Sequence, residues 1–152
     1  MNESILVVDD DAGVRKTLSS ILSHEGYLVE TVENGKQALK ATEKDCFDAA
    51  LIDIELPDMK GIELLLRLKE RQTRMVKIII TGFPSLENAI KAVNEGADAY
   101  ILKPFDIVEL LETIRKHLDE KAVEHFRIWM EMQKGTKFSE QFKKPKGSQF
   151  SR

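Results

Sequence analysis

The sequence lacks the features that define several large classes of protein. Its single cysteine, Cys46, excludes an internal disulfide framework. The start Met1-Asn2-Glu3, followed by a short apolar run, is no signal peptide, and no apolar run approaches the length of a membrane span. We therefore expect a soluble, cytoplasmic protein with no membrane partner.

Basic charge is also scarce in most of the chain. Residues 1–118 hold 15 Lys/Arg and 21 Asp/Glu, a net charge of −6, whereas residues 119–152 hold 8 and 5, a net charge of +3, which together give the −3 of the whole chain. An acidic main part argues against general nucleic-acid binding, because that binding depends on Lys and Arg at the phosphates. Only the basic final segment leaves a weak electrostatic option for such a role.

The length of 152 residues and the 42% hydrophobic composition suit one ordinary globular domain with an appendage. Within that domain, four apolar runs each end at residues that could react or bind a ligand. These are Ile5-Leu6-Val7-Val8 before Asp9-Asp10-Asp11, Ala49-Ala50-Leu51-Ile52 before Asp53, Lys77-Ile78-Ile79-Ile80 before Thr81, and Ala99-Tyr100-Ile101-Leu102 before Lys103. Short apolar runs separated by helix-like segments are typical of strands buried on both faces of a parallel sheet.

Helical patterns alternate with these runs and with one further strand. Gly26 stands where the first helix should stop, Ser85 is a plausible N-cap, and Asp106 and Glu109 have capping-box spacing. A β-α pattern written five times predicts an α/β fold, with a parallel sheet covered by helices on both faces. The strand at about residues 27–32 ends at no reactive group, which is typical of an edge strand. The strand order is then 2-1-3-4-5, a doubly wound arrangement with its ligand crevice between strands 1 and 3.

That crevice would bring Asp9, Asp10 and Asp53 together, with Lys103 beside them. Crowded carboxylates repel one another and lose hydration, so they tend to take up protons unless cations are present. Three ionised acids and one lysine carry a formal charge of −2, which one divalent ion would neutralise. Carboxylate and carbonyl oxygens favour Mg²⁺, or Mn²⁺, over zinc. We therefore expect a magnesium site.

A metal, a lysine, a hydroxyl and a spare carboxylate suit phosphoryl transfer, in which catalysis is mostly positioning and charge neutralisation. Asp53 is the natural covalent acceptor because it stands at the centre of the crevice. In this interpretation Asp10 binds the metal directly, Asp9 binds it directly or through water, and the backbone carbonyl of Glu55 adds a ligand. Lys103 pairs with one phosphoryl oxygen, and Thr81 donates to another.

These residues resemble the receiver domains of two-component response regulators. The matching segments, in the correct order over residues 1–118, are Ile5-Leu6-Val7-Val8-Asp9-Asp10-Asp11, Asp53-Ile54-Glu55-Leu56-Pro57-Asp58-Met59-Lys60-Gly61, Ile80-Thr81-Gly82 and Lys103-Pro104-Phe105. The resemblance implies the flavodoxin-like receiver fold over residues 1–118, phosphorylation of Asp53 by a histidine kinase or phosphotransfer protein, Mg²⁺ on the acid pair, and a cis peptide between Lys103 and Pro104. Many receivers differ at the position of Glu55, so only its backbone role carries over.

The resemblance also implies how such a protein signals. Phosphorylation would draw Thr81 toward the phosphoryl group and let Tyr100, the switch residue, turn inward. The surface formed by the fourth helix, fifth strand and fifth helix would then change its contacts with a downstream protein target or a second copy. A receiver of this kind catalyses only its own phosphorylation and dephosphorylation, so we do not expect an enzyme with a separate substrate.

Residues 119–152 form a short extension. It is too short to fold alone as a DNA-binding domain, since chains below ~40 residues rarely do so without disulfides or metal. Its apolar stripe predicts that the fifth helix continues or restarts to about Lys134, and after Gly135 the composition predicts a flexible, basic tail. The stripe either packs on its own domain or docks a partner or a second copy. It consists of Val123, Phe126, Trp129, Met130 and Gln133.

Three other interpretations remain open at this point. An aspartate-nucleophile phosphatase acting on small phosphate esters uses similar groups, but it has its nucleophile on the first strand and usually needs a cap over the substrate. A flavin carrier shares the strand order but needs a phosphate-cradling loop after the first strand, which this chain lacks. The chain is also compatible with the N-terminal receiver portion of a longer regulator.

Overall fold

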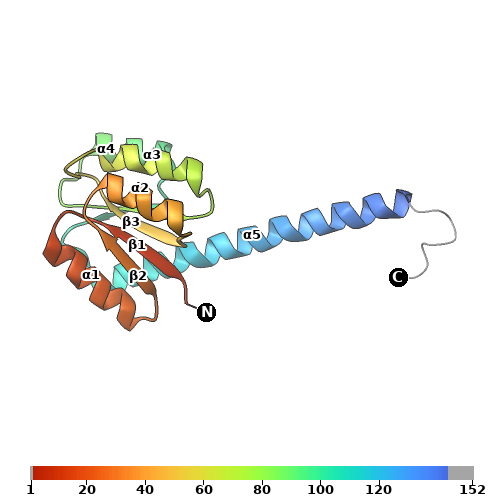
Figure 1. The fold of residues 1–152 in the computed structure, drawn as a ribbon, viewed down its shortest axis with the longest axis horizontal. Helices are drawn as coiled ribbons and strands as arrows, with labels where there is room; N and C mark the ends of the chain where they lie inside the picture. The colour runs from red at the N-terminus through yellow and green to blue at the C-terminus, as the bar shows by residue number, and fades with distance from the viewer. Residues whose placement is uncertain (1, 144–152) are drawn as a thin grey trace. The chain divides into compact units, whose positions relative to one another are not determined.

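The computed structural model describes the backbone of residues 2–143 and the side chains of residues 2–135. Strands and helices alternate along this part of the chain, as the sequence pattern predicts. The elements are β1 (Ser4–Val8), α1 (Ala12–His24), β2 (Leu28–Val32), α2 (Gly35–Lys44), β3 (Ala49–Asp53), α3 (Gly61–Arg71), β4 (Val76–Thr81), α4 (Leu86–Asn94), β5 (Ala99–Leu102) and α5 (Ile107–Lys143) (Figure 1).

The strands form one parallel sheet in the order β2-β1-β3-β4-β5. The predicted doubly wound arrangement is therefore confirmed. β2 is an edge strand, and most of its side chains are exposed or only partly buried, whereas every residue of β3 and β4 is buried. This difference explains why β2 shows a mixed pattern in the sequence and the inner strands read as continuous apolar runs.

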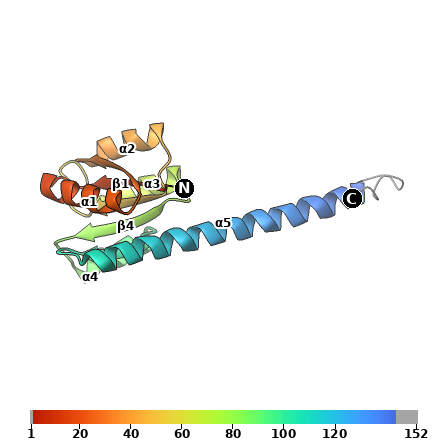
Figure 2. The ribbon, with the colours of Figure 1, turned by 90° about the horizontal axis from the view of Figure 1, so that it is seen from below.

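Helices cover both faces of the sheet and create two separate hydrophobic clusters (Figures 1 and 2). Because side chains of a strand alternate between faces, neighbouring residues such as Leu6 and Val7 belong to different clusters. On one face, α2, α3 and α4 contribute Ala38, Ala41, Leu64, Leu65, Leu68 and Ala92. On the other face, α1 and α5 contribute Leu18, Leu22, Leu110, Ile114 and Leu118.

The helix ends are fixed by the residue types that the sequence places there. The side chain of Asp11 caps α1 by accepting from the Val14 N–H at 3.1 Å, and Ser85 caps α4 by accepting from the Asn88 N–H at 3.0 Å. Gly26 follows α1 with a φ of 96°, a left-handed conformation that favours glycine. These caps hold the ends of α1 and α4 next to the loops that follow β1 and β4.

The described chain divides into two compact units, residues 1–118 and 119–152. Within the second unit, α5 continues through Gly135 to Lys143, beyond the predicted helix end near Lys134. One glycine costs about 1 kcal/mol relative to alanine in a helix, which does not stop a helix whose neighbouring residues favour it. The rest of the predicted flexible tail, residues 144–152, lies outside the described residues. None of the helices in residues 2–143 has both the length and the hydropathy that a membrane span requires.

Candidate functional site

Three carboxylates meet at the carboxyl ends of β1 and β3. These strands are hydrogen-bonded neighbours, with Val8 opposite Ile52, so the residues that follow them are brought together. One carboxylate oxygen from each of Asp9, Asp10 and Asp53 lies within 4.8 Å of the others. Asp9 and Asp53 are buried, with 3% and 8% of their surface exposed, while Asp10 is exposed. The predicted acid cluster is therefore present, with one side open to solvent.

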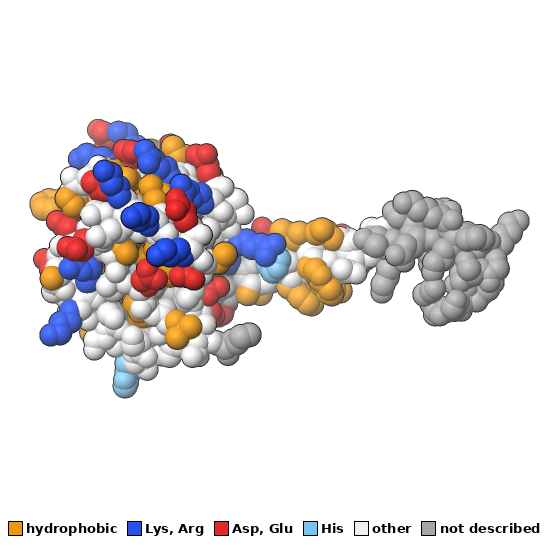
Figure 3. All heavy atoms as spheres, in the orientation of Figure 1, with side chains coloured by type: hydrophobic (Ala, Val, Ile, Leu, Met, Phe, Trp, Pro, Cys, Tyr) orange, Lys and Arg blue, Asp and Glu red, His pale blue; other side chains and the backbone are white. Residues whose placement is uncertain are grey.

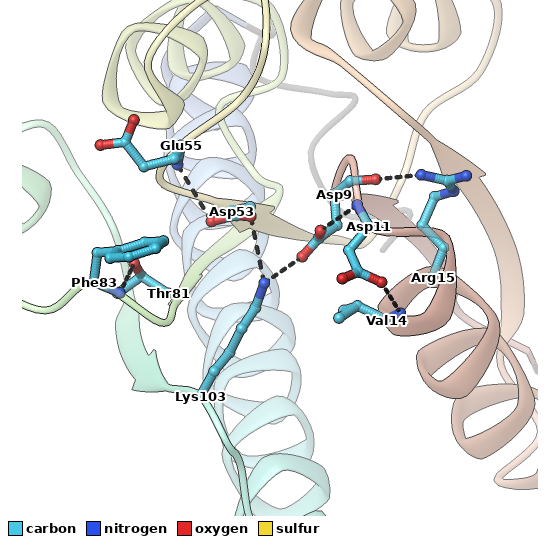
Figure 4. A network of polar contacts seen from close by, with 9 residues as sticks. All are labelled: Asp9, Asp11, Val14, Arg15, Asp53, Glu55, Thr81, Phe83 and Lys103. Carbon is cyan, nitrogen blue, oxygen red and sulfur yellow. Dashed lines mark hydrogen bonds and ion pairs between the residues drawn. The ribbon is translucent and has the colours of Figure 1, made fainter.

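Lys103 joins the two buried acids (Figure 4). Its Nζ lies 2.7 Å from Oδ2 of Asp9 and 3.3 Å from Oδ2 of Asp53. The lysine follows β5, and its peptide bond to Pro104 is cis, as the family resemblance implies. Residues more than 90 positions apart in the sequence thus form a single ion-pair network.

The environment of Asp53 makes its ionised form unfavourable. Burial raises the pKa of this carboxyl group, and the nearby charge of Asp9 raises it further, against the opposing effects of the Glu55 N–H and Lys103. Burial alone would lower the pKa of Lys103, but hydrogen bonding and charge from Asp9, with a smaller contribution from Asp53, raise it above its ordinary value. One cation faces three acids, so this cluster fits a further positive ion.

Asp9 is held in place by the N-cap residue of α1 and by an arginine within that helix. Its Oδ1 accepts from the Asp11 N–H at 2.9 Å, and its backbone carbonyl accepts from Nη1 of Arg15 at 2.8 Å. Arg15 also lies 3.9 Å from Oε1 of Glu33, after β2. Arg15 was not predicted from the sequence, although an arginine one helical turn after the cap residue Asp11 is placed to reach back to the preceding loop.

The loop after Asp53 is fixed from two sides. Gly61 donates its N–H to the Ile54 carbonyl at 2.7 Å, and a Cβ at position 61 would lie only 2.2 Å from the backbone oxygen of Asp53. Asp58 accepts from the N–H groups of Gly35 and Lys36, both at 2.9 Å, at the start of α2. Desolvation alone would raise the pKa of Asp58, but these hydrogen bonds hold it below its ordinary value. Gly61 and Asp58 were predicted only as members of a segment that matches the receiver family.

Glu55 points away from the carboxylate of Asp53 (Figure 4). Its carboxylate pairs with Nζ of Lys60 at 3.1 Å, and only its backbone N–H, which donates to Oδ1 of Asp53 at 3.2 Å, takes part in the site. The ion pair compensates the negative charge of Glu55. Its backbone carbonyl as a metal ligand stays a prediction.

Thr81 and Tyr100 lie on the same face of the sheet. Ile79 is opposite Tyr100 and Thr81 is opposite Leu102, which places the threonine one pleat beyond the tyrosine. Thr81 is fully buried, and its Oγ1 accepts from the Phe83 N–H at 3.0 Å. The hydroxyl of Tyr100 is also buried, and among the described residues it has no hydrogen-bond partner.

Comparison with known proteins agrees with this geometry. Residues 5–115 match the sequence model of the response regulator receiver domain. The chain is 38% identical over 122 residues to the sporulation initiation phosphotransferase F of Bacillus subtilis, covering 80% of this chain and 98% of that protein. It is 36% identical over 123 residues to the DNA-binding transcriptional regulator NtrC of Escherichia coli, covering 81% of this chain but only 25% of that regulator.

A solved structure gives the same result. The CheY-like response regulator receiver domain protein of Methanospirillum hungatei superimposes on this chain with a TM-score of 0.80 and is 44% identical to it. The match covers 82% of this chain and 99% of that one. Whether a DNA-binding domain accompanies the receiver is not decided by these matches, and the expected absence of one stays a prediction. The sequence match, the fold and the arrangement of acids and lysine agree, and the chain belongs to the response regulator receiver domain family.

Proposed function

We propose that this protein is a phosphorylation-controlled switch in which Asp53 accepts a phosphoryl group from a histidine kinase or a phosphotransfer protein. The observation that carries the proposal is the buried Asp53 carboxylate with Asp9, Asp10 and Lys103 around it. A carboxylate can act as a covalent nucleophile toward phosphorus, and the Lys103 ammonium beside Asp53 is placed to neutralise negative charge on the phosphoryl oxygens. The similarity to a phosphotransferase of Bacillus subtilis supports the same chemistry.

The acid cluster would hold Mg²⁺, or Mn²⁺ in its place. Asp10 would bind the ion directly because it is exposed, while Asp9 is engaged by Lys103 and the Asp11 N–H and binds directly or through water. Asp53 and the backbone carbonyl of Glu55 complete the proposed set of protein ligands. The ion would neutralise negative charge on the phosphoryl oxygens and on the acids.

Lys103 and Thr81 would hold the phosphoryl group. Lys103 already contacts Asp53 at 3.3 Å, so a short movement away from Asp9 would bring it to a phosphoryl oxygen. A threonine hydroxyl has one donor and two acceptor sites, and the Phe83 N–H occupies an acceptor site of Thr81. The proton of the hydroxyl therefore stays available for donation to the new group on Asp53.

The output surface would be formed by α4, β5 and α5. Its apolar side chains include Leu86, Ile90 and Val93, one face of α4, which are 78%, 51% and 65% exposed. Val108 at the start of α5 is 64% exposed. Exposed apolar side chains in neighbouring elements favour binding to another protein. The occupant would be a downstream target or a second copy of the receiver.

Tyr100 would link the site to this surface, with one change from the prediction. Its hydroxyl is already buried in this structure, so phosphorylation need not bring it inside. Movement of Thr81 toward Asp53 would instead rearrange residues 81–83 and provide the hydrogen bond that the hydroxyl of Tyr100 lacks. A hydrogen bond that Tyr100 makes only in the phosphorylated protein would shift the population of conformations toward the one that contains this bond.

Intact-mass measurement after incubation with a small phosphodonor and Mg²⁺ tests the proposal. We expect the protein to gain the mass of one phosphoryl group, lost again at alkaline pH as an acyl phosphate is. Asp53→Asn should remove the gain, whereas Asp45→Asn, at an exposed acid beyond α2, should not. Labelling that persists in Asp53→Asn, or that survives alkali, would contradict the assignment.

A further inference from the structure

The part of α5 after Leu118 presents large apolar side chains to solvent (Figure 3). Val123, Phe126, Trp129 and Met130 are 67%, 60%, 48% and 41% exposed. The rings of Phe126 and Trp129 stack with their centroids 6.0 Å apart. Clustered exposure of this kind is unusual for a helix without a binding partner.

These residues follow the spacing of a coiled-coil seam. Val123, Phe126, Met130 and Gln133 are separated by three, four and three positions, which places them along one side of the helix. Trp129 borders this seam. Ile128 is 45% exposed and lies almost opposite the seam. Along the helix axis, the midpoint of the seam residues from Val123 to Gln133 lies at residue 128.

The described seam residues match one another in two antiparallel copies. That arrangement places Val123 opposite Gln133 and Phe126 opposite Met130.

One pair of opposite charges beside the seam favours the antiparallel orientation. Glu120 and Lys134 border the same side of the seam, and an antiparallel arrangement brings Glu120 of one copy to Lys134 of the other. Within one helix they are 14 residues apart, about 21 Å at 1.5 Å per residue, so they cannot contact each other in a single chain. Glu120 and Lys134 are thus complementary between two copies and not within one.

We infer that the extension of α5 binds a second copy of this chain as an antiparallel helix pair centred near residue 128. The inference does not depend on phosphorylation of Asp53, because every residue that carries it lies in the extension. The pairing uses the extension and is separate from any contact made by the surface of α4, β5 and α5.

Sedimentation equilibrium of the full unphosphorylated chain over a range of concentrations tests the pairing. We expect dimers that dissociate on dilution, with the emission of Trp129, the single tryptophan, moving to longer wavelength as they do. Phe126→Glu should weaken the dimer more than tenfold, whereas Ile128→Glu, on the opposite side, should change it less than threefold. Circular dichroism checks that both variants keep their helix. A chain that is monomeric throughout, or a dimer unaffected by Phe126→Glu, would overturn the inference.

The orientation has its own test. Glu120→Lys and Lys134→Glu should each weaken the dimer several-fold by placing like charges opposite each other, and the double variant should restore the affinity to within about threefold. Only an antiparallel pair predicts that recovery, because the two positions do not meet in a single helix or in a parallel pair. A double variant no tighter than the weaker single variant would overturn the antiparallel arrangement.

Discussion

Replacing Gly61 by alanine tests how rigidly the backbone supports Asp53. The added Cβ would lie 2.2 Å from the Asp53 carbonyl oxygen and 2.7 Å from the Cα of Ile54. Ordinary contacts of this kind begin at 3.4 Å, so the two backbone segments must separate by about 1 Å. Both contacts are to backbone, which cannot move aside as a flexible side chain does.

The size of the effect follows from this separation. Forcing an extra methyl group into a packed site costs typically about 1–3 kcal/mol of unfolding free energy. The same movement displaces the reacting carboxylate, and a misplacement of about 1 Å can slow a reaction by ~100-fold. We therefore expect Gly61→Ala to lose stability and to lose most of its phosphorylation rate.

Urea unfolding and the rate of labelling by a small phosphodonor measure these two effects. Gly82→Ala is the matched control for stability, because its Cβ would lie 3.8 Å from the nearest atom, in the Lys103 side chain. We expect that control to unfold within about 1 kcal/mol of the original protein. A Gly61→Ala variant with unchanged stability and labelling would refute the argument that the Asp53 carbonyl has no room to move.

Three further predictions concern the acids. Saturating Mg²⁺ should stabilise the protein, by about 2.7 kcal/mol at a hundredfold excess over its dissociation constant, and Asp10→Asn should remove most of this gain in thermal unfolding. Asp53→Asn should unfold a few degrees higher at pH 7 without metal, because it removes a buried charge whose ionisation destabilises the folded state. The pKa of Asp53 is raised in the folded protein, so this loss of stability is absent below the unfolded pKa, grows as the pH rises and is complete above the folded pKa. Asp58→Ala should lose about 1–2 kcal/mol in urea unfolding, and Asp58→Asn, which keeps one acceptor oxygen, should lose less.

Each of these has an outcome that contradicts it. An equal stabilisation by Mg²⁺ in Asp10→Asn would show that the exposed acid does not bind the ion. A stability difference between Asp53→Asn and the original protein that grew toward low pH would reverse the sign expected from a raised pKa. Equal stability of Asp58→Ala and the original protein would show that the loop does not support α2.

The sequence predicted the fold and the centre of the site because both depend on a strong pattern. Apolar runs that end in Asp9, Asp53, Thr81 and Lys103 can be read without knowing any contact, and parallel strands bring their ends together. The edge position of β2 was visible for the same reason, since an edge strand is half exposed. The order of the strands then placed Asp53 between Asp9 and Lys103.

Other features were not predicted because they depend on particular side-chain contacts that residue type alone does not reveal. Arg15 reaches the carbonyl of Asp9, and Asp58 caps a helix 22 residues away, at Lys36, yet neither position differs in type from a surface residue. The burial of the Tyr100 hydroxyl depends on how the ring packs, which spacing does not determine. The end of α5 was predicted near Lys134, before Gly135, but one glycine is a weak stop signal and the helix continues to Lys143.

The coverage of one sheet face by both the first and the last helix has a consequence for biosynthesis. Leu110, Ile114 and Leu118 are translated long after β1, yet they cover the same face as α1. At about 5–20 residues per second, the ribosome leaves that side of a growing chain uncovered for several seconds. A nascent chain stopped before residue 107 should therefore bind to chaperones and to other chains, and folding of the receiver should be complete only after α5 has emerged.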